Sequence, residues 1–175
     1  MDFDPRTDRL SFNDLDEAEQ ARGRATVPSD DARILHLQRV PLFSGFNENE
    51  FRRVAELSRI AEAPAGTVVT QMGEPGDSFF IIIDGAVAVR TPVGAGSQLK
   101  PGDFFGEMSL LDGEPRSATI VATTDVRLLI VDRSHFWQLL GEAPDLVSRI
   151  LTILSRRVRR LEQTVQAILR GTNPA

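Results

Sequence analysis

The sequence predicts an α+β fold in which an antiparallel β-barrel or sandwich is flanked by helices at both ends. Short apolar segments rich in β-branched residues are separated by Gly, Pro and Asp turns, without the strand–helix–strand alternation of a parallel sheet. Asp84-Gly85 between two such segments indicates a type I′ hairpin. The predicted strands cover residues 67–72, 78–83, 86–90, 118–123 and 126–131.

A helix is predicted over residues 48–58, before the first of these strands. Asn47 can act as its N-cap, and Glu50 at the third helical position completes a capping box. Phe46 and Phe51 stand on either side of this start at the spacing of a hydrophobic staple. The start of this helix is therefore specified twice, by polar and by apolar residues.

Composition divides the chain into four segments. Residues 1–28 are polar and charged without a sustained apolar period, which is typical of a disordered acidic arm. From Ser29, which can cap a short helix, residues 29–142 form the strand-rich unit with its N-terminal helices. Residues 143–170 predict one long C-terminal helix, and residues 171–175 form a tail.

The composition excludes several kinds of chemistry. There is no cysteine, and His36 and His135 are isolated, so disulfides, thiolate catalysis, iron–sulfur clusters and metal sites are not expected. There is no apolar run of 18 residues and no secretory leader, so we expect a cytoplasmic protein without a membrane span. The net charge is −5 although residues 146–175 carry +5, and an acidic body disfavours broad nucleic-acid binding. For the arginines of that basic segment we expect a solvated helix face, with binding to DNA or an acidic partner as the alternative.

Apolar residues of the last helix recur at alternating steps of four and three, which is the heptad seam of a coiled coil. Mostly β-branched residues at a and mostly Leu or Ile at d favour a parallel homodimer through residues 147–168. Arg157 and Glu162 then have the spacing of an interchain ion pair. A helix lying on its own barrel would use a similar stripe, and this alternative stays open. The predicted seam residues are Val147, Leu151, Leu154, Val158, Leu161, Val165 and Ile168.

Residues 104–119 are suited to bind an anion. Gly106 permits close approach of the backbone, and the turn of helix that can follow it presents free N–H groups and the positive end of a dipole. Arg116, held just after Pro115, adds a planar cation that fits a phosphate. Glu107 would repel a multiply charged phosphate, which favours a singly charged anion with a hydroxyl for the carboxylate to accept. A cyclic nucleotide meets both conditions; the alternative is an Arg116–Glu107 ion pair that closes an empty loop.

The segment FGEMSLLDGEPRSATIVA resembles the phosphate-binding cassette of the cyclic nucleotide-binding domain family, as found in catabolite-activator-type regulators and kinase regulatory subunits. The segments PLFSGF, GEPGDSFFIIIDGAVAV and PGDFFGE extend the resemblance over residues 37–169. The resemblance implies a β-roll with flanking helices. It also implies that Glu107 accepts the ribose 2′-OH and that Arg116 pairs with an exocyclic phosphate oxygen, with backbone amides near the cyclic phosphate and no metal ion. The ligand-binding residues that it implies are Gly106, Glu107, Met108, Ser109, Arg116, Ser117 and Ala118.

The resemblance leaves the base and the output open. In activator-type members, polar residues of the long helix bind adenine, whereas the corresponding lid region here offers Leu161, Glu162 and Thr164. Glu162 can accept from guanine or from adenine, and we expect a cyclic mononucleotide, cAMP in preference to cGMP. Five residues remain beyond Arg170, so we expect no helix-turn-helix domain after this helix.

We therefore expect a stand-alone receptor that binds a cyclic mononucleotide and regulates an unidentified effector protein. Residues 143–170 would repack over the pocket when the ligand closes the cassette. Two alternatives are the sensor half of a DNA-binding transcription regulator that lacks its reader domain, and a ligand-free dimerisation module. An enzyme is not expected, because Glu107 has no acid–base partner and neither Ser109 nor Ser117 has a neighbouring histidine.

Overall fold

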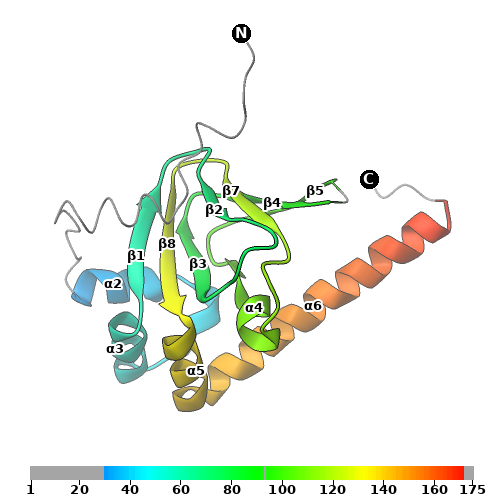
Figure 1. The fold of residues 1–175 in the computed structure, drawn as a ribbon. Helices are drawn as coiled ribbons and strands as arrows, with labels where there is room; N and C mark the ends of the chain where they lie inside the picture. The colour runs from blue at the N-terminus through cyan, green and yellow to red at the C-terminus, as the bar shows by residue number, and fades with distance from the viewer. Residues whose placement is uncertain (1–29, 93, 172–175) are drawn as a thin grey trace, which may run out of the picture.

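The computed structural model describes residues 30–92 and 94–171 (Figure 1). The arm predicted over residues 1–28, the Ser29 cap and residues 172–175 lie outside the described residues. The helices are α2 (Asp30–Leu37), the 3-10 helix η1 (Pro41–Phe43), α3 (Glu48–Glu56), α4 (Glu107–Asp112), α5 (Arg133–Glu142) and α6 (Pro144–Leu169). The strands are β1 (Arg59–Ala63), β2 (Val68–Thr70), β3 (Ser78–Asp84), β4 (Val87–Thr91), β5 (Gly94–Leu99), β6 (Phe104–Phe105), β7 (Thr119–Ala122) and β8 (Val126–Asp132).

The strands form two four-stranded sheets, with the orders β1-β8-β3-β6 and β2-β7-β4-β5. Every pairing in both sheets is antiparallel, which confirms the predicted α+β fold with an antiparallel roll and flanking helices. Figure 1 shows α2, α3 and α5 gathered at one end of the strands, with α4 on the side of the roll that α6 passes.

The turn after β3 differs from its prediction. Asp84-Gly85 does not close a type I′ hairpin, because β3 and β4 lie in different sheets. A type I′ turn also needs a positive φ at both of its central residues. Gly85 has φ +81°, but the φ of Asp84 is not positive. A Cβ atom at Gly85 would overlap the carbonyl oxygen of Asp125, so glycine is required here where the chain leaves one sheet for the other.

Two hydrophobic cores lie on opposite faces of the β1-β8-β3-β6 sheet. Phe79 and Phe104 belong to the core that the helices cover, with ring centroids 5.3 Å apart. Phe80 and Phe105 face the other sheet and stack with centroids 4.9 Å apart. Because β3 is buried on both faces, its apolar residues run without interruption rather than alternating with polar ones. The same two-sided packing fixes β6, the strand that leads directly into the predicted cassette.

The start of α3 is formed as predicted. The Oδ1 atom of Asn47 accepts a bond of 3.0 Å from the amide of Glu50, and Glu50 Oε2 accepts one of 2.7 Å from the amide of Asn47. The rings of Phe46 and Phe51 lie 5.9 Å apart between centroids. The helix ends at Glu56, two residues before the predicted end, and β1 begins three residues later.

Helix α6 is packed at its start and exposed further along. Leu146 and Ile150 are buried, and Ile153 and Leu154 pack against the helix-covered core. Arg149, for which a solvated face was expected, is partly buried, and its Nη1 donates a bond of 2.7 Å to the Oγ of Ser44. In Figure 1 the helix then passes α4 and continues beyond the strands.

The predicted seam residues of α6 fall into two groups. Val147 and Leu154 are partly buried against the chain itself, whereas the other five are more than half exposed: Leu151, Val158, Leu161, Val165 and Ile168. The early turns of the helix therefore use the stripe to lie on the roll, and the later turns present it to solvent. None of the described helices has the length and apolar character needed to cross a membrane.

Candidate functional site

The candidate site begins at Gly106, between β6 and α4. Gly106 has φ +85°, a conformation that L side chains rarely adopt. A Cβ atom there would lie 2.8 Å from Arg116 Nη1 and 2.8 Å from the carbonyl oxygen of Ser78. Glycine is thus required both by the backbone angle and by the closeness of the Arg116 guanidinium.

Arg116 is buried, with 7% of its surface exposed. Its Nη1 donates to the carbonyl oxygen of Gly106 at 3.0 Å, and its Nη2 to that of Ser78 at 2.9 Å. The guanidinium also lies over the ring of Phe80, 5.6 Å from the centroid. These two hydrogen bonds use two of the five N–H donors of an arginine, so the group can hold its carbonyls and still donate to an anion.

Glu107, the first residue of α4, is 3% exposed and is paired with α6. Its Oε1 accepts a bond of 3.0 Å from Nη1 of Arg157. Nη2 of Arg157 donates to the carbonyl oxygen of Phe104, and its guanidinium lies 4.6 Å from the centroid of that ring. The contacts that Glu107 and Arg116 make therefore differ from the mutual ion pair considered as an alternative. Arg157 joins the C-terminal helix to the cassette within one chain.

Burial dominates the ionisation of both cassette side chains. Desolvation raises the pKa of Glu107 above its usual value, and the positive charge of Arg157 opposes this rise. Desolvation also lowers the pKa of the Arg116 guanidinium, while the nearby carboxylate of Asp77 opposes this change. The site therefore holds two opposite charges in an environment that favours neither, where a ligand with a hydroxyl and a negative charge can satisfy both.

The other predicted ligand-binding residues lie around these two. Ser109 is 2% exposed and lies within α4, whereas Met108 is about half exposed on the same helix. The hydroxyl of Ser117 donates to the sulfur of Met108 at 3.6 Å, which ties the two ends of the cassette together. Ala118 is partly buried beside the second core.

The predicted lid residues do not cover the site in this conformation. Leu161, Glu162 and Thr164 are exposed on α6. The hydroxyl of Thr164 donates instead to the carbonyl oxygen of Arg160, one turn earlier in its own helix. The contact between α6 and the cassette is made by Arg157, which the sequence analysis assigned to an interchain ion pair with Glu162.

The turn between β2 and β3 is a further part of the site that the sequence analysis did not single out. The amide of Arg116 donates to the carbonyl oxygen of Glu74 at 2.8 Å, and the amide of Gly73 donates to that of Arg116 at 2.9 Å. A Cβ atom at Gly76 would lie 2.6 Å from Cβ of Ser109 and 2.7 Å from Nε of Arg116. The glycine and proline content of GEPGDS was the available signal for this close approach.

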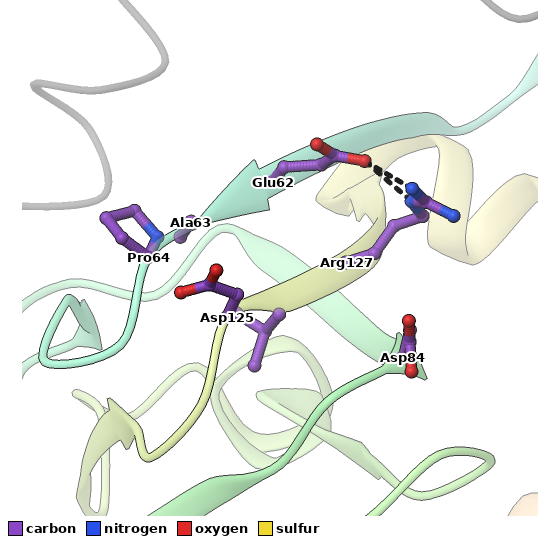
Figure 2. A pocket seen from close by; sticks show the side chains of 7 residues that line it. Glu62, Ala63, Pro64, Asp84, Asp125 and Arg127 are labelled. Carbon is purple, nitrogen blue, oxygen red and sulfur yellow. Dashed lines mark hydrogen bonds and ion pairs between the residues drawn. The ribbon is translucent and has the colours of Figure 1, made fainter.

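A separate pocket lies at the β1–β8 edge of the roll and has a volume of about 330 Å³ (Figure 2). Carboxylates dominate its polar lining: Glu62 is bound to Arg127, and Asp84 and Asp125 accept bonds from backbone amides beside them. An acidic lining repels a phosphate, so the cassette is the better anion site. Within residues 30–92 and 94–171, no cluster of His, Asp and Glu could hold a metal ion.

The fold and this site define a small-ligand receptor domain: an antiparallel roll whose cassette presents a buried arginine and a buried carboxylate. Residues 60–143 match the family model of the cyclic nucleotide-binding domain, and the chain contains a domain of that family. A cyclic nucleotide-gated potassium channel of Mesorhizobium japonicum is 40% identical over 119 residues, which are 67% of this chain and 33% of the channel. A cAMP-dependent protein kinase regulatory subunit of Aspergillus niger is 39% identical over 115 residues, 65% of this chain and 28% of that protein.

The catabolite activator protein of Thermus thermophilus has a similar structure, with a TM-score of 0.66 and 30% sequence identity. The similarity covers 73% of this chain and 62% of the activator. The chain thus matches about a third of the channel and of the kinase subunit, and a larger part of the activator. A channel, a kinase regulatory subunit and an activator protein thus each share a region with this chain.

Proposed function

We propose that this chain binds a cyclic mononucleotide, cAMP in preference to cGMP, at the cassette around α4. The observation that carries the proposal is the burial of Arg116 and Glu107, of opposite charge, within one short cassette segment. The kinase subunit and the activator are named for cAMP dependence and catabolite activation, and both resemble this chain in the receptor domain. The role of the domain is recognition of the nucleotide and not its chemical conversion.

The roles of the cassette residues follow from their chemistry. Arg116 binds an exocyclic phosphate oxygen with the donors that Gly106 and Ser78 leave unused. Glu107 accepts the ribose 2′-OH with the oxygen that Arg157 does not bind. The remaining residues of the proposed ligand site supply backbone amides or line it: Met108, Ser109, Ser117 and Ala118.

Calorimetric titration with cAMP, cGMP, cCMP and cyclic dinucleotides tests this function. We expect cAMP to bind most tightly and Arg116→Ala to weaken it about 100-fold, since a charge-assisted hydrogen bond contributes about 1.5–3 kcal/mol. Arg127→Ala is the matched control, because Arg127 pairs with the exposed Glu62 at the other pocket. No binding to any ligand of the panel, or unchanged affinity in Arg116→Ala, would contradict the proposal.

We further propose that residues 29–142 form the receptor unit and that residues 143–170 carry its output to an effector protein. Glu107 is shared by the ribose and by Arg157, so a ligand changes the contact that joins α6 to the cassette. Amide exchange of residues 143–170 with and without saturating cAMP measures this coupling. Unchanged protection would exclude α6 as the output element.

We also propose that the exposed stripe of α6 pairs with a second copy of the chain as a parallel coiled coil. Leu161 is 65% exposed in the middle of this stripe, and a second copy supplies the matching apolar face. Leu161→Glu should shift the chain to monomer in sedimentation equilibrium, whereas Gln163→Glu, off the seam, should not. Identical masses for the two variants would contradict the dimer.

A further inference from the structure

Arg133 is the first residue of α5, and its side chain binds the backbone of two other segments. Its Nη2 donates to the carbonyl oxygen of Gly76 at 2.7 Å and to that of Ser109 at 3.0 Å, and its Nη1 donates to that of Leu110 at 3.3 Å. Its amide donates to the carbonyl oxygen of Asp77 at 2.7 Å. One residue thus joins the start of α5 to the β2–β3 turn and to α4.

The two segments that Arg133 joins, the β2–β3 turn and α4, lie on either side of the Arg116 guanidinium. The β2–β3 turn holds the backbone of Arg116 through Gly73 and Glu74. Gly76 in the same turn leaves no room for a side chain between Ser109 of α4 and the guanidinium of Arg116. The distance between turn and helix therefore determines where the Arg116 guanidinium can lie.

The acceptors of Arg133 are backbone carbonyls, which satisfy its donors without cancelling its charge. Ser109 and Leu110 lie in α4, and the carbonyl oxygen of Ser109 also accepts a bond of 3.2 Å from the C-cap amide of Gly113. The positive charge of Arg133 also contributes, after desolvation, to the lowered pKa of Arg116, which places it within electrostatic reach of that residue. The arrangement adds positive potential at the end of the site where an anion binds.

We propose that Arg133 is a positioning residue for the phosphate end of the candidate site. It holds the β2–β3 turn against α4, so that the guanidinium of Arg116 has one position. Because it also begins α5, it passes a displacement of α4 to that helix. This proposal rests on the proposed nucleotide-binding function and adds to it a residue that does not touch the ligand.

The test compares Arg133→Met and Arg133→Lys with the control Arg127→Met in the full chain. The probes are cAMP and its two phosphorothioate diastereomers, which differ only in the exocyclic phosphate oxygen that sulfur replaces. If Arg133 fixes the position of Arg116, Arg133→Met binds cAMP about tenfold or more weakly and its preference between the diastereomers falls. Arg133→Lys keeps the charge but does not span both segments, so it recovers part of the affinity and little of the preference. The control Arg127→Met keeps both the affinity for cAMP and the preference between the diastereomers.

Thermal melts establish that each variant is folded, and a second measurement on the unaltered chain needs no variant. Saturating cAMP should slow amide exchange in residues 133–137 as well as in α4. Folded Arg133 variants with unchanged affinity and diastereomer preference, or unchanged exchange in residues 133–137, would overturn the positioning role while the nucleotide function stands. No binding of cAMP by the unaltered chain would refute the proposed function and, with it, the role of Arg133.

Discussion

Replacing Arg157 with methionine tests the contact between α6 and the cassette. Glu107 is 4% exposed at its side chain and Arg157 is 30% exposed, so the change leaves a carboxylate buried without its cationic partner. Removing one member of a fully buried pair costs about 3–5 kcal/mol, and the partial exposure of Arg157 lowers the expected cost to about 2 kcal/mol. For a chain of this size, that corresponds to a fall in melting temperature of about 4–8 °C.

The pH dependence of this loss identifies its source. Burial raises the pKa of Glu107 in the folded protein above that in the unfolded chain, so the folded state binds more protons at Glu107 between the two values. Stability therefore falls as the pH rises through this window. Removing Arg157 raises the folded pKa of Glu107 further and extends the pH window upward. Each added unit of pKa lowers the free energy of unfolding above the window by about 1.4 kcal/mol. We expect a small difference between Arg157→Met and the unaltered chain near pH 4.5 and a larger one at pH 8.

The assay is thermal and urea unfolding at pH 4.5 and pH 8, with two comparisons. Glu107→Gln in the Arg157→Met background removes the unpaired charge and should recover part of the stability at pH 8. Arg127→Met breaks a pair whose acid, Glu62, is 62% exposed at its side chain, so it should cost at most about 1 kcal/mol. The reasoning is refuted if Arg157→Met loses nothing, or if its loss is equal at both pH values and Glu107→Gln does not relieve it.

Three further changes have definite expected outcomes. Gly106→Ala places a Cβ atom 2.8 Å from Arg116 Nη1 at a φ of +85°, so we expect a loss of about 2 kcal/mol in urea unfolding and loss of cAMP binding by calorimetry. Glu142 accepts hydrogen bonding from Arg53, which lowers the pKa of the Glu142 carboxyl to about 2. In Arg53→Gln we expect an NMR titration to find this pKa moved toward 4.5. An unchanged pKa would show that Arg53 plays no part in the titration of Glu142. The lowered pKa of Glu142 stabilises the folded state at pH values above the unfolded pKa. The unaltered chain should therefore lose this stabilisation as the pH falls from about 4.5 toward 2. Asn47→Ala removes the N-cap of α3 and should lower the free energy of unfolding in urea by about 1 kcal/mol. An unchanged free energy of unfolding would show that the cap is dispensable.

The strands with strong apolar patterns were predicted from the sequence, and those without such patterns were not. β3 and β8 are buried on both faces and read as continuous apolar runs. β1 has the sequence RIAEA and β5 has GAGSQL, where charge and glycine hide a strand that pairing with β8 or β4 stabilises. The error at Asp84-Gly85 has a related cause, since a local turn signal does not show that the next strand joins another sheet.

Within the site, the residues carried by one continuous motif were predicted and the contacts across the fold were not. Gly106, Glu107 and Arg116 lie within eleven positions of the sequence, in a segment whose chemistry favours an anion. Arg157 is 50 positions from Glu107 and also fits a heptad position, so the sequence pattern does not indicate that Arg157 contacts the cassette. Arg133 binds carbonyl oxygens, which every residue has, and such contacts leave no pattern in a sequence.

Under the proposed function, the contact between Arg157 and Glu107 lets the short helix α4 act on the long helix α6. The first turns of α6 are held by the buried side chains of Leu146 and Ile150 and by Ile153 and Leu154, which pack against the same core, so the helix can move mainly beyond Leu154. Arg157 lies roughly 20 Å from the start and Leu169 roughly twice as far, at 1.5 Å per residue. If the part of the helix beyond Leu154 turns as a straight rod, a displacement at Arg157 is therefore larger at the exposed end. Under the proposed function, a ligand that draws Glu107 away from Arg157 acts just beyond the packed turns, and we expect the exposed apolar turns beyond Arg157 to move most.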